Sequence, residues 1–188
     1  MPKSVTSELI KLKNVRLSFP NLYTKKVYPG ASEENSKYEA TFLLHKEDQK
    51  ELISKIQEEI KKMFEKAEFK GKLAADKICL KDGDLFISDE TGKVFDGYEG
   101  HMSIKASNKH QPPCFAGARG QELIPTDDGT FDAGCYVNAN IELWFQDNQF
   151  GKRVNANLKG VQFFKEGESF TGSKVSTSSD FDEIEYEF

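Results

Sequence analysis

Aromatic and cationic side chains lie on the polar faces of three expected β-strands in the C-terminal half of the chain. Apolar residues occupy every second position of 101–107, 135–146 and 152–159, so the residues between them point away from the core. Because exposed rings are costly to solvate, an aromatic and basic sheet face indicates a ligand surface. The outward positions, with the residue just beyond the first strand, hold His101, Lys105, Lys109, Tyr136, Trp144, Arg153 and Lys159.

Single-stranded nucleic acid is the ligand that this combination fits. Every base has a π-face that can stack on a ring at about 1–3 kcal/mol per base, while Lys and Arg follow the phosphates. Asparagines beside the rings can hydrogen-bond base edges or phosphates. The alternative is that Tyr136 and Trp144 lie under a helix or loop as a second core layer, and for either ring alone both interpretations stay open.

The C-terminal residues differ in composition from the rest of the chain. Residues 171–179, TGSKVSTSS, form a Gly/Ser/Thr linker without periodicity. Residues 180–188, DFDEIEYEF, hold five of the 31 acidic residues and no Lys or Arg. The net charge is −5, so the other 26 acidic residues balance the 26 Lys and Arg of 1–179. The body is therefore neutral, and the net charge does not argue against binding of an anion.

This acidic tail could serve two purposes. Its carboxylates could imitate phosphates and compete for a basic groove, and its apolar side chains could dock into a pocket of a partner protein. A merely solubilising end would not need four large apolar residues. The predicted partner-binding residues are Asp180, Phe181, Asp182, Glu183, Ile184, Glu185, Tyr186, Glu187 and Phe188.

The N-terminal half predicts two strands joined by a loop. Residues 8–19 alternate in two phases that differ by one residue near Lys13 and Asn14, which is typical of a strand with a bulge. A long loop is expected at 20–36 because it contains two prolines and a glycine, and the second strand at 37–45.

An amphipathic helix is predicted at about 48–67, with its apolar residues on one stripe. Asp48 and Glu51 resemble a capping box at its start, and Gly71 lies beyond its end. The phase of the flanking strands places three aromatic residues in the core: Phe19, Phe42 and Phe145.

The later strands define the fold class. Residues 135–146 and 152–164 alternate cleanly around a turn and predict a β-hairpin, while 108–134 reads as a long excursion. One helix among several long strands predicts a mainly β barrel with a helical insertion. The expected division is a domain at 1–170 and a flexible linker with acidic tail at 171–188.

Enzyme and metal-binding functions find little support. The three histidines share no ligand spacing, and no nucleophile or phosphate-loop motif occurs. Turn chemistry explains Asp82-Gly83-Asp84 and Asp127-Asp128 better than a divalent ion does. Without any CxxC, the cysteines are expected to be buried free thiols, at Cys79, Cys114 and Cys135. No cofactor is expected. Because no signal peptide or membrane-spanning stretch is recognised, a cytoplasmic location is expected.

Three segments resemble the bacteriophage single-stranded-DNA-binding proteins, which have an OB-fold core and an acidic tail ending in aromatic residues. They are GHMSIKAS at 100–107, DAGCYVNANIELWFQDNQFGKRVNANLKGVQFFKEGE at 132–168, and the closing DEIEYEF. The resemblance implies a five-stranded OB barrel that binds ssDNA without strong sequence preference in a bacterial host cell. It also implies a tail that recruits replication or recombination proteins, and a possible homodimer, although the residues leave the oligomeric state open.

Carried onto matching positions, the resemblance places DNA contacts on outward strand residues and basic loops. They are Lys105, Lys109, Arg119, Tyr136, Trp144, Lys152, Arg153 and Lys159. Two other functions remain open: a phage structural or adaptor β-domain that binds a partner through its tail and never meets DNA, and a metal-dependent nuclease accessory.

Overall fold

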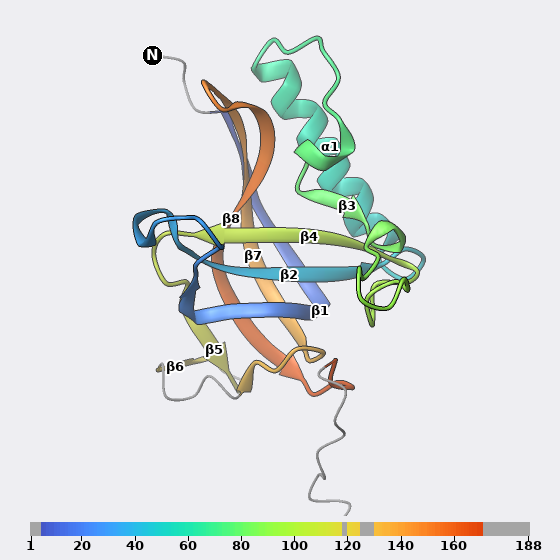
Figure 1. Cartoon of the computed structure of the whole chain (residues 1–188), viewed down its shortest axis with the longest axis vertical. Helices are drawn as coiled ribbons and strands as arrows, with labels where there is room; N and C mark the ends of the chain where they lie inside the picture. Colours follow the sequence, from blue (N-terminus) through green and yellow to red (C-terminus); the bar gives the residue numbers. More distant parts are fainter. Residues whose placement is uncertain (1–4, 118–119, 125–129, 171–188) are drawn as a thin grey trace, which may run out of the picture.

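The strands of the computed structural model, which describes residues 5–117, 120–124 and 130–170, close into a barrel (Figure 1). β1 pairs with β2 and β7, β2 with β4, and β7 with β8, all antiparallel. A parallel pair, Ser107 of β4 with Asn157 of β8, closes the ring. The predicted mainly β, OB-like barrel with an inserted helix is thereby confirmed. The barrel strands are β1 (Val5–Lys26), β2 (Lys37–His45), β4 (His101–Asn108), β7 (Tyr136–Asn148) and β8 (Gly151–Lys165).

Shorter elements are attached to this barrel. The helix α1 (Lys50–Lys66) packs on β1 and β7. β3 pairs with the edge of β4, while β5 pairs with β8 and with β6. None of the helices in the described part of the chain has the length and hydrophobicity needed to cross a membrane. The remaining elements are β3 (Leu80–Asp82), β5 (Cys114–Ala116), β6 (Gln121–Leu123) and the 3-10 turns η1 (Glu33–Asn35), η2 (Ala75–Lys77) and η3 (Gly83–Leu85).

The long strand β1 belongs to both layers of the barrel. In Figure 1, β2 and β4 cross in front of β7 and β8. The first part of β1 pairs with β7, and its later part pairs with β2. Inward-facing aliphatic residues of all five strands fill the space between the layers, and one apolar stripe of α1 covers it. That stripe consists of Ile53, Ile56, Ile60 and Met63.

The predicted bulge in β1 is confirmed. The pairing of β1 with β7 shifts between Leu12 and Val15, and Asn14 has a φ of 53°. The bulge leaves carbonyl groups without ladder partners, and the Gln49 side chain satisfies them. Its Nε2 donates to the oxygens of Lys13 at 2.9 Å and of Asn14 at 3.1 Å. The start of the helix is thus fastened to the bulge.

The predicted capping box does not form. The helix begins at Lys50, its N-cap residue is Gln49, and no side chain caps it. Asp48 instead lies beside His45, with 3.5 Å between Oδ2 and Nδ1. The Gln49 side chain is already committed to the bulge, so the chain enters the helix without a side-chain cap.

Two further expectations for this half are wrong. The loop at 20–36 is shorter than predicted because β1 continues to Lys26. Phe42 and Phe145 are buried as expected, but Phe19 is 57% exposed. Its φ of 45° breaks the alternation of β1 and turns the ring away from the core.

Candidate nucleic-acid interface

β7 and β8 form the predicted hairpin and present a polar outer surface, here named the β7–β8 face. Their pairing places Asn155 opposite Trp144 and Arg153 opposite Gln146. The residues between these positions are buried in the core, so the alternation orients the face as predicted. The β7–β8 face consists of Asn138, Asn140, Glu142, Trp144, Gln146, Arg153, Asn155, Asn157 and Lys159.

Trp144 is the large ring of this face. It is half-buried and lies between Thr6 of β1 and Asn155 of β8 in the sheet. Asn155 is held in place because its Nδ2 donates to Gln146 Oε1 at 2.9 Å. Trp144 is not part of the hydrophobic core that the described residues form. The ring therefore lies on the outer side of the sheet among polar side chains.

The cations of the hairpin have weak partners. Lys159 lies 3.8 Å from Glu142, and Lys152 lies 3.8 Å from Asp147 and 5.0 Å above the ring of Phe69. Exposed pairs of this kind contribute at most about 1 kcal/mol and weaken with salt. Within the described residues Arg153 has no ion-pair partner. A phosphate could therefore reach these cations at little cost.

Lys105 lies on the outer side of β4, two positions before the residue that closes the barrel. It is ion-paired with Glu39 at 3.2 Å and donates to the Tyr28 hydroxyl, which itself donates to Glu39 at 2.5 Å. Burial would lower the pKa of Lys105, but Tyr28 and Glu39 together raise it, so Lys105 is a cation at neutral pH. Lys109 is exposed just beyond β4.

The closing pair joins these cations to the β7–β8 face. Side chains two residues apart on a strand share a side, so Lys105 lies on the side of Ser107, and Lys159 lies on the side of its partner Asn157. Lys109 follows directly after the end of β4. The barrel thus brings Lys105, Lys109, Trp144, Arg153 and Lys159 onto one curved outer surface.

Tyr136 lies elsewhere. It begins β7, at the far end of that strand from Trp144, and its ring is 4.8 Å from Lys165 and 5.8 Å from Arg16. Arg16 also stacks on Phe170 at 4.1 Å and donates to the oxygen of Glu168 at 2.6 Å. Tyr136 therefore belongs to a cluster that fastens the last described residues to the barrel. Arg119 and the tail, 180–188, lie outside the described residues.

The segment 83–100 covers the part of the outer side of β1, β2 and β4 around Ser18 and Ser103, which is here named the covered face. Tyr98 is only 2% exposed, and its hydroxyl lies 2.9 Å from Ser18 Oγ. Its ring contacts Phe86 at 5.2 Å and Phe95 at 5.8 Å between centroids. Alternation within the barrel strands gave no sign of this cover, because it does not reveal which segment crosses over a strand.

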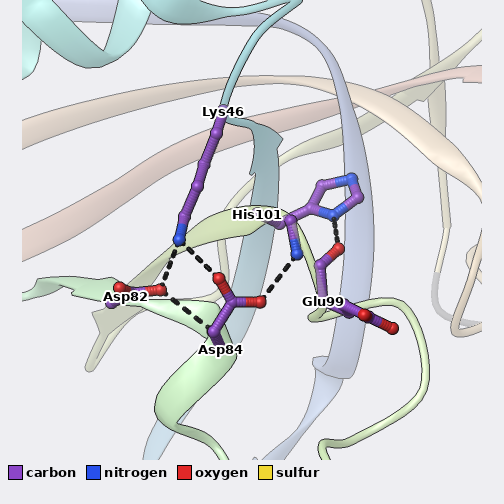
Figure 2. A network of polar contacts seen from close by, with 6 residues as sticks. Lys46, Asp82, Asp84, Glu99 and His101 are labelled. Carbon is purple, nitrogen blue, oxygen red and sulfur yellow. Dashed lines mark hydrogen bonds and ion pairs between the residues drawn. The ribbon is translucent and has the colours of Figure 1, made fainter.

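An ionic clamp attaches this segment to the barrel (Figure 2). Lys46 Nζ lies 2.7 Å from Asp82 Oδ1 and 2.6 Å from Asp84 Oδ2. Asp84 also accepts a hydrogen bond from the backbone of Gly100 at 2.8 Å. The lysine and the Gly100 N–H lower the pKa of Asp84, and the two aspartates raise the pKa of Lys46. Asp82 accepts from Asp84 N at 3.0 Å, the turn chemistry predicted for Asp82-Gly83-Asp84.

The cysteines are free thiols, as predicted; Cys114 and Cys135 are buried as expected, whereas Cys79 is only partly buried. Burial raises the pKa of Cys79 and of Cys135 to about 12. Thiols with such values are unreactive at neutral pH. Across 5–117, 120–124 and 130–170, no group of three or more His, Cys, Asp or Glu side chains could hold a metal ion.

A closed barrel of five strands defines an OB-type fold, and its basic, aromatic outer surface is typical of OB-folds that bind single-stranded nucleic acid. The sequence matches, over residues 8–188, the family described as Enterobacter phage Enc34, ssDNA-binding protein. The chain belongs to this family.

Individual relatives agree with this assignment. Protein p50 of Acyrthosiphon pisum secondary endosymbiont phage 1 is 38% identical over 186 residues, which is 93% of each chain. The single-stranded DNA-binding protein from bacteriophage Enc34, solved in complex with ssDNA, superimposes with a TM-score of 0.73 at 31% identity, covering 86% of this chain and 89% of that one. Another structure of the Enc34 protein gives a TM-score of 0.72 at 31% identity, covering 93% and 90%.

Proposed function

We propose that this chain binds single-stranded DNA without strong sequence preference and protects it during phage DNA replication and recombination in the bacterial cell. The observation that carries the proposal is Trp144, an aromatic ring outside the core on a face lined with asparagines, Arg153 and Lys159. Membership of the Enc34 family and the ssDNA complex of a 31% identical relative support it.

The mechanism is binding alone. A base stacks on Trp144 at about 1–3 kcal/mol, and the phosphates lie along Arg153 and Lys159 toward the cations of β4. Phosphates replace Glu142 as the partner of Lys159, an exchange that costs little because the pair is exposed. Asparagine side chains donate to phosphates or base edges without the cost of desolvating a charge. Arg119 and Lys152 keep their predicted roles as further contacts, whereas the position of Tyr136 beside Arg16 and Lys165 favours the structural alternative for that ring.

The tail acts on the same surface and on other proteins. In this proposal, residues 180–188 compete with DNA through their five carboxylates and, once displaced, recruit replication or recombination proteins through their apolar side chains. Phe170, the last described residue, is fixed against Arg16, so the nine-residue linker starts from a defined point.

The sole tryptophan gives a direct test. Oligo-dT should quench the fluorescence of Trp144 strongly in the full chain, because the base stacks on its ring. Filter binding with single- and double-stranded DNA runs in parallel. If the chain binds neither single- nor double-stranded DNA and its fluorescence does not change, it is the adaptor domain instead. Cleavage of the DNA that a chelator prevents would indicate the nuclease accessory.

Deleting 180–188 tests the tail separately. The shortened chain should bind ssDNA more tightly, above all at low salt, and with a steeper dependence on salt, because salt no longer weakens a competing tail together with the DNA contacts. A full-length variant with Asn and Gln in place of the five acidic residues is the matched control and should behave like the deletion. Equal affinities for wild type and deletion at two salt concentrations would rule out competition by the tail.

A further inference from the structure

Phe19 has an unusual backbone conformation. Its φ of 45° lies in the left-handed region, where the other non-glycine residues of the described chain are Asn14 and Glu68. Asparagine tolerates this region, but for a bulky aromatic residue it is a strained conformation. The next residue is Pro20, and a residue before proline prefers an extended backbone instead. The fold thus holds Phe19 where glycine or asparagine would be cheaper.

The ring gains little from that position. It is 57% exposed, although edge contacts fix its orientation. Phe95 meets it at 5.8 Å and 82° between ring planes, and Tyr98 lies 6.4 Å away. Strained residues kept by the surrounding structure concentrate at functional sites. An exposed, rigidly held ring on a strained backbone is better suited to contacting a ligand than to stabilising the fold.

The neighbourhood of Phe19 has the chemistry of a nucleotide site. Ser18, the preceding residue, pairs with Thr41, which pairs in turn with Lys105 on the outer side of the sheet. Tyr28, 45% exposed, lies against Lys105 with 4.9 Å between Nζ and the ring centroid. Two exposed rings therefore lie on the same side of the sheet as a cation, which matches the alternation of bases and phosphates in a single strand.

We propose that Phe19 is a base-stacking residue, and that the DNA path extends from the β7–β8 face past Lys105 to the exposed edge of the covered face. The proposal rests on the proposed function and assigns to it a second aromatic contact. Its physical content is that the strain at Phe19 serves DNA binding and is not needed for folding.

Three variants separate stacking from stability. Phe19→Gly removes the ring and the strain, Phe19→Ala removes the ring alone, and Phe19→Tyr keeps both. Glycine adopts a positive φ without steric cost, so Phe19→Gly should unfold at a higher temperature than Phe19→Ala. Both should bind oligo-dT about 5- to 150-fold more weakly than wild type, the range of one stacked base, while Phe19→Tyr should bind normally.

Two controls and a reporter complete the test. Phe164→Ala removes a ring of similar exposure, 52%, at the end of β8 that lies away from Arg153. Asn14→Gly relieves a positive φ without removing a ring. Neither should weaken binding. With Trp144→Phe as background, Phe19→Trp should give fluorescence that oligo-dT quenches. If wild type binds oligo-dT and Phe19→Gly binds it equally tightly, this inference alone is overturned. If wild type does not bind, the proposed function itself is overturned.

Discussion

The β7–β8 face and the covered face are two outer surfaces of one barrel, and both carry alternating side chains over a buried core. On the first, Trp144 stays outside the core among polar residues. On the second, Tyr98 is sealed between the strands and other rings, and Lys46 clamps the covering segment. The direction of a side chain is therefore set by its own strand, but its availability to a ligand is set by whatever crosses above it.

The largest expected difference between the two faces is in the free energy of unfolding. Tyr98→Ala should lower the free energy of unfolding by about 3–5 kcal/mol, because it empties a packed aromatic site and leaves the Ser18 hydroxyl unpaired. Trp144→Ala should cost about 1 kcal/mol, the centre of the usual range for point substitutions, because the ring is half-buried but outside the core. Urea unfolding of both variants measures the difference. Equal losses would mean that Trp144 is structural and that the two faces do not differ.

The next effect concerns binding at the β7–β8 face. Trp144→Ala should weaken binding to oligo-dT by about 1–3 kcal/mol, while Trp144→Phe should retain most of the affinity. Fluorescence anisotropy of a labelled oligonucleotide measures both, and unfolding curves check that the variants remain folded. If Trp144→Phe bound as poorly as Trp144→Ala, stacking on this ring would not be the source of the affinity.

A smaller effect should appear in the dependence on salt. Each phosphate contact with a single strand contributes roughly 0.7 to the slope of log K against log salt. Arg153→Ala should reduce the slope by about this amount, because it removes one such contact. Lys165→Ala, beside Tyr136 at the far end of the hairpin, is the matched control and should leave the slope unchanged. A change of equal size in both would mean that the cations act only through overall charge.

The smallest effect belongs to the clamp on the covered face. The pKa of Asp84 is lowered in the folded chain, so its stabilising contribution is complete above its ordinary pKa of 3.8 and is lost as pH falls through the lower folded value. Acid should therefore loosen the segment 83–100, which near-UV circular dichroism of its aromatic residues would report. Asp84→Asn should remove this step. A transition unchanged by the substitution would place its origin in other carboxyl groups.

Much of the fold follows from local pattern. The hairpin at 135–146 and 152–164, the bulge near Asn14 and the inserted helix were predictable because period, phase shift and amphipathic stripe are recorded in adjacent residues. Phe19 was not, because one residue with a positive φ reverses the apparent phase of its strand.

The start of the helix and the shape of the site depend on longer-range contacts. Gln49 replaces the expected cap because it bonds to a bulge 35 residues earlier in the chain. The grouping of Lys105 with Arg153 depends on a parallel pairing of β4 with β8, and the aromatic cover depends on where the segment 83–100 lies. No local sequence pattern encodes contacts between residues that lie so far apart in the chain.

The closing pair of the barrel has a consequence for its motions. β4 and β8 meet in the ladder at Ser107 and Asn157, assisted by a side-chain bond from Asn108 to the oxygen of Leu158 at 3.0 Å. Because β4 and β8 share so short a ladder, the barrel should open first between these two strands. Local opening of this kind exposes amides to hydrogen exchange. The proposed strand of DNA lies across the same seam, so that bound nucleotides would join the two edges from outside. Bound DNA would then hold β4 and β8 together and slow the opening of the barrel between them.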